Sequence, residues 1–267
     1  MSLIDDVFSS LKKANQNALI PFLTADFPNR KMFNYFLHGL PDAGASIIEI
    51  GIPFSDPMAD GVVIQRASEI AIKNGFNLSQ LFEDVTLFKN KFPFTPIVLM
   101  TYLNPLIHYG MDLFLTDAKR AGVDGLLVVD LPPESHQKVI KSSHEISMIR
   151  LITPTTNDTR LTLINQSASG FIYYVSVKGI TGTQRPDLRS IVSHLDLIKT
   201  NISLPMVIGF GIDSVESATA MARLSDGIVI GSRLIQPLLD VPSSKYKDQI
   251  LTQLSFLNDI HLAINND

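Results

Sequence analysis

The chain has 267 residues, of which 45% are hydrophobic and 18% charged, and its 22 basic against 26 acidic residues give a net charge of −4. The high apolar fraction excludes a disordered chain, and the lack of a basic run argues against nucleic-acid binding. Because cysteine is absent, disulfides, thiol catalysis and cysteine metal sites are excluded.

The N-terminal segment, MSLIDDVFSSLKKANQN, carries two Asp and two Lys where a secretion signal would be apolar. Further along, no apolar run approaches the roughly 18 residues that a membrane-spanning helix needs. We therefore expect a soluble, cytoplasmic protein.

Eight short apolar runs, rich in β-branched residues, recur at fairly even intervals along the chain. They cover residues 18–24, 46–51, 95–102, 124–132, 146–152, 171–177, 204–211 and 226–232. Most are continuously apolar rather than alternating, which is typical of strands covered on both faces. The pattern predicts eight strands of a parallel sheet.

Segments with helical spacing separate these runs, among them residues 110–122, 158–170 and 214–224, and 244–264 predicts one long amphipathic closing helix. Several turns from a helix to the next strand carry a glycine, at Gly44, Gly122 and Gly170, where a left-handed residue is expected. Pro41 is expected to kink or end the first of the helices between strands.

Eight strand–helix units indicate either a closed (β/α)8 barrel or a doubly wound open sheet. A dinucleotide-binding open sheet would carry G-x-G-x-x-G after its first strand, whereas PFLTADFP stands there and has no glycine. We therefore predict an α/β fold of the (β/α)8 TIM-barrel type. Barrels of about 250 residues are single domains, so one domain is expected over residues 1–267.

Glu49 is the polar residue most out of place, because it lies inside the second predicted strand. Alternation along that strand puts Ile48 and Ile50 on one face and Glu49 on the other, pointing into the barrel near its carboxyl end. A buried carboxylate there is either satisfied by neighbouring hydrogen bonds or used in function.

The loop that follows, GIPFSDPMADG (51–61), offers Asp56 and Asp60 before a helix that begins near Gly61. One of the two aspartates is expected to cap this helix or shape the turn. Glu49 and Asp60 nevertheless follow one strand end and can converge on one cavity, where a carboxylate pair can divide acid, base and cation-stabilising roles.

Glycine-rich turns follow the last two predicted strands, with Gly209 and Gly211 after the seventh and Gly231-Ser232 after the eighth. Barrels that bind phosphorylated substrates hold the phosphate on backbone N–H groups of these two loops. The glycines could also simply make tight turns, but their pairing on consecutive strands favours the phosphate-binding type of barrel.

Other residues near strand ends complete the predicted site. The loop 177–190 is long and polar enough to be a lid over a ligand. Apolar and aromatic side chains could line a pocket for a flat ring, namely Phe22, Met100, Tyr102, Leu127 and Tyr173. The six histidines show no metal-ligand spacing, so no metal site is expected.

The run EIGIPFSDPMADG (49–61) resembles the signature of the tryptophan synthase α subunit. The segments MTYLNPLIHYG (100–110), GLLVVDLPPES (125–135), KGITGT (178–183), GFGI (209–212) and GSRLI (231–235) resemble it in the same order and spacing. The resemblance implies a TIM barrel that cleaves indole-3-glycerol phosphate to indole and glyceraldehyde 3-phosphate by retro-aldol chemistry.

The resemblance also implies roles for individual residues. Glu49 matches the acid/base carboxylate, and Asp60 matches the carboxylate that holds the indole N–H. The indole pocket corresponds to Phe22, Tyr102, Leu127 and Tyr173, and the phosphate site to Gly182, Gly211, Gly231 and Ser232. Thr181 matches a lid residue that closes towards Asp60, and Pro53 and Asp56 match positions that face the β subunit.

The same resemblance implies an α2β2 heterotetramer in which the β partner carries pyridoxal phosphate and this chain needs no cofactor of its own. Two features depart from the family pattern: Asp26 stands where glycine is usual in the first loop, and Val177-Lys178 stands where an Arg and a small residue are common. Asp tolerates a left-handed backbone better than most residues. A free-standing lyase without a partner and a non-catalytic regulatory barrel remain as alternatives.

Overall fold

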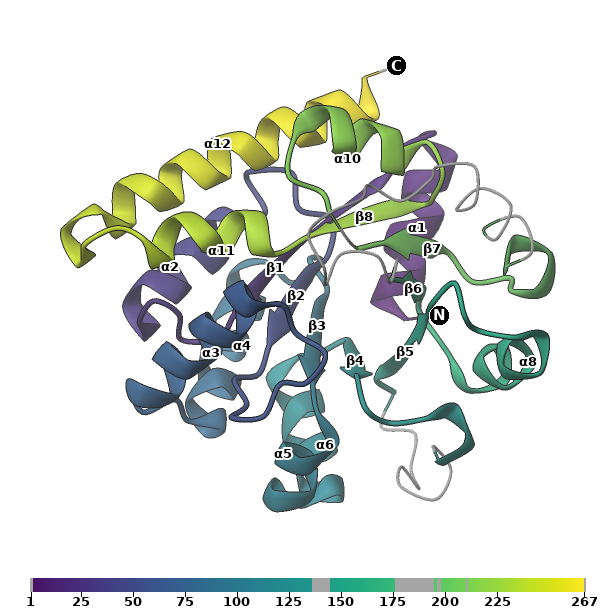
Figure 1. The fold of residues 1–267 in the computed structure, drawn as a ribbon, viewed down its shortest axis with the longest axis horizontal. Coiled ribbons are helices and arrows are strands. Elements are labelled where there is room, and N and C mark those ends of the chain that lie inside the picture. The colour runs from purple at the N-terminus through teal and green to yellow at the C-terminus, as the bar shows by residue number, and fades with distance from the viewer. Residues whose placement is uncertain (1, 136–144, 176–194, 196–197, 210, 267) are drawn as a thin grey trace.

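The computed structural model describes residues 2–135, 145–175, 195, 198–209 and 211–266. Strands β1 to β8 pair in chain order and β8 pairs again with β1, which closes the barrel. All the strand pairs are parallel, and helices surround the barrel (Figure 1). The predicted (β/α)8 TIM barrel is thereby confirmed.

The strands lie where the apolar runs predict them. Their bounds are β1 Ala18–Thr24, β2 Ile48–Gly51, β3 Ile97–Thr101, β4 Gly125–Val128, β5 Ser147–Ile152, β6 Ile172–Tyr174, β7 Met206–Ile208 and β8 Gly227–Ile230. Several are shorter than the apolar run that contains them, because the ladder of hydrogen bonds extends only as far as both neighbours stay paired. The residues beyond the ladder form the loops at the mouth of the barrel.

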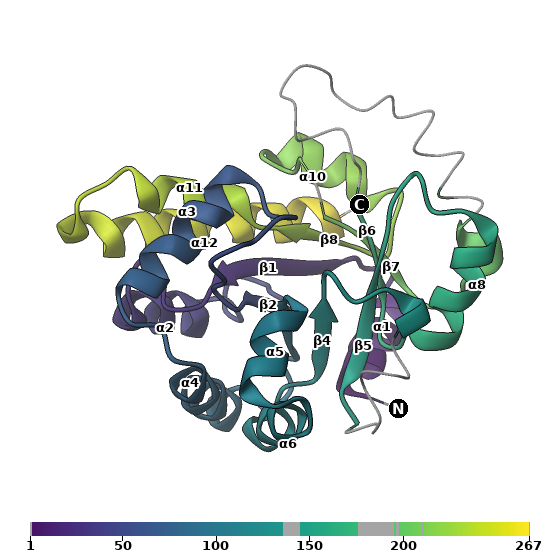
Figure 2. The same cartoon turned by 60° about the horizontal axis from the view of Figure 1, so that its bottom comes forward.

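In chain order, the helices begin with α1 Leu3–Lys13, which precedes β1, and α2 Arg30–Gly39, α3 Val62–Lys73, α4 Leu78–Lys91, α5 Leu103–Tyr109 and α6 Met111–Ala121. They continue with η1 Pro133–Ser135, α8 Asp158–Ser167, α10 Val215–Ala222, α11 Ser232–Leu239, η3 Ser243–Lys245 and α12 Tyr246–Asn265. The predicted closing helix is α12. It packs against α2, α10 and α11, and Figures 1 and 2 place α2 and α3 on the side of the barrel opposite α8.

The predicted turn residues adopt the expected conformations. Gly44, Gly122 and Gly170 have φ of 89°, 95° and 79°, in the left-handed region. Helix α2 ends just before Pro41, as predicted. Asp26, which replaces the usual glycine in the first loop, has φ of 57°, a conformation that Asp tolerates better than most side chains.

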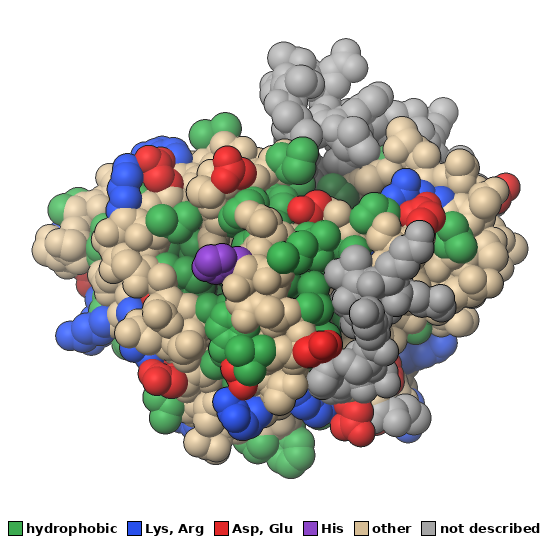
Figure 3. Space-filling view, turned by 90° about the horizontal axis from the view of Figure 1, so that it is seen from below, with side chains coloured by type: hydrophobic (Ala, Val, Ile, Leu, Met, Phe, Trp, Pro, Cys, Tyr) green, Lys and Arg blue, Asp and Glu red, His purple; other side chains and the backbone are tan. Residues whose placement is uncertain are grey.

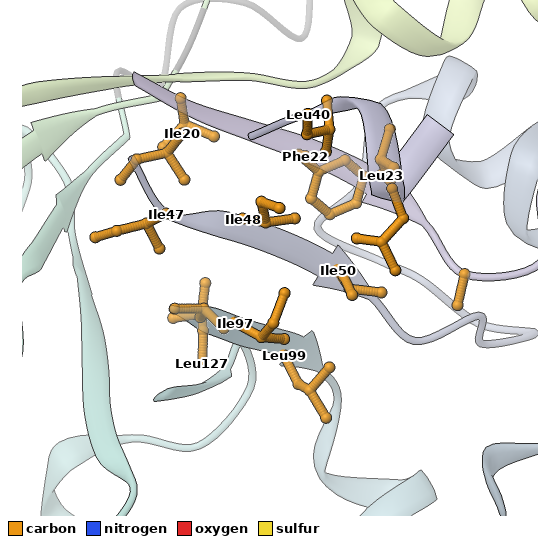
Figure 4. Close-up of a cluster of buried hydrophobic side chains, with 14 of the residues drawn as sticks. Ile20, Phe22, Leu23, Leu40, Ile47, Ile48, Ile50, Ile97, Leu99 and Leu127 are labelled. Carbon is orange, nitrogen blue, oxygen red and sulfur yellow. The ribbon is translucent and has the colours of Figure 1, made fainter. Parts of the chain in front are cut away.

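Side chains of β1, β2 and β3 pack in one cluster, which Figure 4 shows in part. Phe22 of β1 is the register partner of Glu49, which is in turn the partner of Val98 on β3. Partners in neighbouring strands point to the same face of a sheet. Since Phe22 lies over Gly51, two residues beyond Glu49, Glu49 faces the barrel interior, as the alternation predicts.

Helix α1 covers part of the amino end of the barrel. Its Ile4 is fully buried, and a side chain added at Gly125 or Gly170 would meet it at 3.0 or 3.3 Å. The functional site therefore belongs at the other end, where the carboxyl ends of the strands and their loops meet. In the described part of the chain, no helix is long and apolar enough to cross a membrane.

Candidate active site

A cavity of about 540 Å³ lies at the carboxyl end of the barrel. Strand residues from six strands line it, namely Phe22, Met100, Leu127, Leu151, Tyr173 and Val229, and the loops add Asp60, Gly211, Gly231 and Ser232. A larger cavity of about 810 Å³ lies at the amino end, between α1, α10 and α12. Because TIM-barrel chemistry occurs at the carboxyl end, we assign the site to the smaller cavity.

Glu49 lies next to this cavity but is not part of its wall. Only 2% of the residue is exposed, and neither carboxyl oxygen has a hydrogen-bond partner among the described residues. Burial, and then the charge of Asp60, raises the pKa of Glu49 to about 8. Hydrogen bonds from the described residues therefore do not satisfy this carboxyl, and Glu49 keeps its proton at neutral pH.

Asp60 lines the cavity from the loop between β2 and α3. Burial raises the pKa of Asp60 to about 6, although a hydrogen bond from Tyr102 lowers it in part. Gly61 is the N-cap of α3 and makes no side-chain cap bond, so Asp60 does not serve as that cap. Near neutral pH the site therefore combines a protonated Glu49 with an ionised Asp60.

The glycine-rich turns meet at one edge of the cavity, as predicted. Gly211, Gly231 and Ser232 all line it. Gly211 has φ of 67°, and no described residue lies within 4 Å of a side chain added there. Ser232 is the first residue of α11 and Gly231 its N-cap, so the unpaired backbone N–H groups of that helix start at this edge, where an anion is favoured.

The predicted aromatic and apolar wall is also present, with one exception. Phe22, Met100, Leu127 and Tyr173 line the cavity. Tyr173 is the residue that Gly209 accommodates, because a side chain at Gly209 would lie 2.2 Å from the tyrosine hydroxyl. Burial, and then the charges of Glu49 and Asp60, raise the pKa of Tyr173, so its phenol keeps its proton.

Tyr102 differs from the prediction, because it does not line the cavity. Its side chain is buried beneath the loop that carries Asp60, where the phenol ring packs on Phe54 with centroids 5.3 Å apart. The hydroxyl accepts a hydrogen bond from the Ala59 N–H at 3.0 Å. A strand-end aromatic can face the pocket or the loop above it, and the sequence does not distinguish the two.

Two residues were predicted to face a partner, and they differ in exposure. Asp56 is exposed, and its carboxylate accepts a hydrogen bond from the Ser55 hydroxyl. Pro53 is buried, because it lies in the inner part of the loop next to the strand end, and it adds little to an exposed surface. Thr181 and Gly182, with the rest of the predicted lid at 177–190, lie outside the described residues.

Sequence reasoning missed several lining residues. The apolar ones include Val129, Leu151 and Val229, and the polar ones are Asp213, Arg233 and Gln236. Register would have found Leu151, since it is the partner of Tyr173. The polar residues lie on α11 and in the loop before α10, where no strand alternation exists to indicate which face they take.

The combination of groups limits the chemistry of the site. A protonated carboxyl and a carboxylate next to an apolar wall can pass a proton and stabilise a developing cation. An edge of glycine N–H groups can hold a phosphate. Within the described ranges, no three His, Cys, Asp or Glu side chains cluster in a way that could hold a metal ion.

The family model described as tryptophan synthase alpha chain matches residues 8–262. The tryptophan synthase alpha chain of Cupriavidus pinatubonensis is 46% identical over 244 residues, which are 91% of this chain and 92% of that protein. The Burkholderia multivorans protein of the same name is 45% identical over 267 residues, covering 99% and 97% of the two chains. A crystal structure of tryptophan synthase subunit alpha from Legionella pneumophila matches with a TM-score of 0.91 and 35% identity over 100% of both chains.

These matches span nearly the whole chain, and they agree with a cavity that has the Asp60 carboxylate in its wall, the Glu49 carboxyl beside it and a glycine-rich edge. A regulatory barrel without chemistry would not need an unpartnered buried carboxyl beside the cavity. The chain therefore belongs to the tryptophan synthase alpha chain family, the carbon–carbon lyases that cleave indole-3-glycerol phosphate to indole and glyceraldehyde 3-phosphate.

Proposed function

We propose that Glu49 is the acid and base of this cleavage and that Asp60 stabilises the cationic indole ring. The observation that carries the proposal is the state of Glu49, which is buried beside a cavity lined by Asp60 and has no hydrogen-bond partner in the part of the chain that the structure describes. Leaving a buried carboxyl unsatisfied is costly, so its retention next to a second carboxyl supports a role in chemistry.

The two carboxyls divide the reaction as follows. Glu49 gives its proton to C3 of the indole ring, which leaves a positive charge on the ring nitrogen. Asp60, ionised near the N–H, lowers the energy of this cation. Glu49, now a carboxylate, takes the proton of the glycerol hydroxyl as the bond between C3 and the glycerol carbon breaks, and the bond electrons neutralise the ring. Indole and an aldehyde are released, and Glu49 has its proton back.

Glu49 is not among the residues that line the cavity, so its carboxyl must turn towards the cavity to do this. Rotation about its side-chain bonds breaks no hydrogen bond to the described residues, because neither oxygen has a partner there. The experiment that tests the proposal is an assay of indole release from indole-3-glycerol phosphate by the purified chain, in the parent protein and in the carboxyl variants described in the Discussion.

The glycine-rich edge is proposed to bind the substrate phosphate, and Gly211→Ala tests it. A side chain at φ of 67° strains the backbone, which would move the N–H groups away from the phosphate. We expect KM to rise by roughly tenfold, about 1.4 kcal/mol, with kcat less affected and indole binding unchanged. Steady-state kinetics and competition by glycerol phosphate measure this.

Gly75→Ala is the matched control, because Gly75 also has positive φ (85°) and open space around it but lies in the turn after α3. If both variants raise KM equally, the effect is general backbone strain. If glycerol phosphate does not compete with substrate in the parent protein, the phosphate assignment is wrong.

The partner is proposed to be a β subunit that holds pyridoxal phosphate, in an α2β2 assembly in the cytoplasm, with no cofactor in this chain. Exposed apolar side chains support a docking surface near the loop 51–61, since Met58 is 84% exposed and Ile107 of α5 is 60% exposed. Figure 3 shows the molecule from below and has a band of hydrophobic side chains on this face. Helices α5 and α6 lie on the same side of the molecule, at the bottom of Figure 1.

Docking of the β subunit is expected to raise the lyase rate, because ordering the outer part of the loop also orders Asp60 on its inner part. Asp56→Ala should weaken this stimulation and leave the basal rate of the isolated chain intact. Titration of β subunit while indole release is followed measures both. The exposed Asp259 of α12 supplies the control, Asp259→Ala. No rise in rate at saturating β subunit would favour the free-standing lyase.

A further inference from the structure

Tyr102 occupies an unusual place for an aromatic residue at the end of a barrel strand. It is the N-cap residue of α5 and is only 2% exposed, yet it is absent from the cavity wall. Its ring packs on Phe54, and its hydroxyl accepts from the N–H of Ala59 at 3.0 Å. Both of these contacts are with the loop between β2 and α3, the loop that carries Asp60.

The same hydroxyl acts on the carboxyl of Asp60, the residue after Ala59, and lowers the pKa of that carboxyl against the effect of burial. A phenol has one proton to donate and lone pairs to accept with, so it can accept from the Ala59 N–H and donate to Asp60 at the same time. Burial and the nearby Asp60 charge raise the pKa of Tyr102 above its usual value, which keeps the phenol proton available for donation.

Tyr102 is itself held by the barrel. The N–H of Leu103, the next residue, donates to the carboxylate of Asp130 at 2.7 Å, and the carbonyl of Tyr102 accepts from the hydroxyl of Thr101 at 3.2 Å. These bonds connect the start of α5 to strand β3 and to the loop after β4. The barrel therefore holds the phenol in place, and the phenol in turn holds the inner part of the loop between β2 and α3. The outer part of that loop, including Met58, is exposed.

We propose that Tyr102 is a positioning residue for Asp60: its hydroxyl holds the Ala59–Asp60 segment so that the carboxylate faces the cavity in a fixed place. The inference rests on the role proposed above for Asp60. Electrostatic stabilisation of a cation requires the anion to be in position before the charge develops, and supporting hydrogen bonds provide that preorganisation.

Tyr102→Phe separates this role from simple packing, because it keeps the ring on Phe54 and removes only the hydroxyl. When a mutation removes a hydrogen bond to a group that is charged in the transition state, kcat falls by roughly tenfold or more. We expect kcat to fall by roughly tenfold and KM to change less than about twofold.

The pH profile supplies a readout that lost packing would not move. A donor to a carboxylate favours its ionised form, so removing the Tyr102 hydroxyl should raise the pKa of Asp60 above its value of about 6. The acidic limb of the kcat profile should therefore shift to higher pH. Tyr109→Phe is the matched control: its hydroxyl donates to Asp117 at 2.7 Å, away from the cavity, and its removal should leave both kcat and the acidic limb unchanged.

A double-mutant cycle with Asp60→Asn completes the test. If Tyr102 acts through Asp60, adding Tyr102→Phe to the Asp60→Asn variant should lower kcat by less than about twofold, against roughly tenfold in the parent background. If Tyr102→Phe lowers kcat equally in both backgrounds, or leaves the acidic limb of the kcat profile where it is, the positioning role of Tyr102 is wrong, while the proposed role of Asp60 is unaffected. Full activity of Asp60→Asn by itself overturns the proposed role of Asp60, and the inference with it.

Discussion

Glu49→Gln is expected to lower kcat for cleavage of indole-3-glycerol phosphate by roughly 10²–10⁴-fold, which is the usual effect of removing a positioned acid and base. The amide has nearly the shape of the protonated carboxyl but transfers no proton. Substrate binding should change far less. Single-turnover and steady-state assays of indole release measure the two effects separately, with Glu69→Gln, an exposed ion-pair residue of α3, as the control.

The same variant should not lose stability, and this separates chemistry from folding. The pKa of Glu49 is raised by burial from 4.5 to about 8 in the folded chain. Between these pH values the folded state keeps a proton that the unfolded state releases, so this carboxyl lowers stability as pH rises through that window. Gln does not titrate, so Glu49→Gln should be more stable than the parent protein at pH 8 and similar at low pH.

Thermal or urea unfolding at both pH values checks this result. Near-normal turnover of Glu49→Gln would remove the carboxyl from the mechanism. A variant that loses activity and also unfolds more easily at every pH would instead point to a structural role.

Asp60→Asn is expected to lower kcat by roughly 10²-fold or more, because the amide retains a hydrogen bond to the indole N–H but carries no negative charge to stabilise the cation. In the parent protein, kcat should rise with pH around the Asp60 pKa of about 6, since only the ionised form stabilises the ring. This acidic limb should be absent from the Asn variant.

Asp112→Asn, at an exposed carboxylate of α6, controls for the change in net charge and should leave the profile intact. If Asp60→Asn raised KM by as much as it lowered kcat/KM, the residue would be a binding group that holds substrate and transition state equally. If the Asp60→Asn variant kept the acidic limb of the kcat profile, that limb would belong to a group other than Asp60.

Much of the barrel could be predicted from the sequence because strand and helix preferences are local. The continuous apolar runs indicated buried parallel strands, and alternation around Glu49 indicated its inward direction. Left-handed positions were also predictable, as Gly122 and Asp26 illustrate, since only a few residue types tolerate them. These features depend on neighbours a few residues away along the chain.

The contents of the cavity depended on tertiary structure. Closure of the barrel by the pairing of β8 with β1 brings Gly231 next to Phe22, far away in the chain, so that a side chain added at Gly231 would lie 3.4 Å from the phenylalanine. Strand lengths were overestimated, as in 204–211 against Met206–Ile208, because a run of apolar residues does not reveal where its neighbours stop pairing.

Tyr102 and Pro53 show the limit most clearly. Tyr102 was assigned to the pocket by its place near a strand end and Pro53 to the partner surface by the family resemblance, yet Tyr102 lies beneath the loop that carries Asp60 and Pro53 is buried within it. The amino-acid order alone determined the strand–helix alternation, the inward carboxyl and the glycine turns. Only the folded chain decided which side of a loop each side chain takes, because that choice depends on packing against residues that the sequence keeps far away.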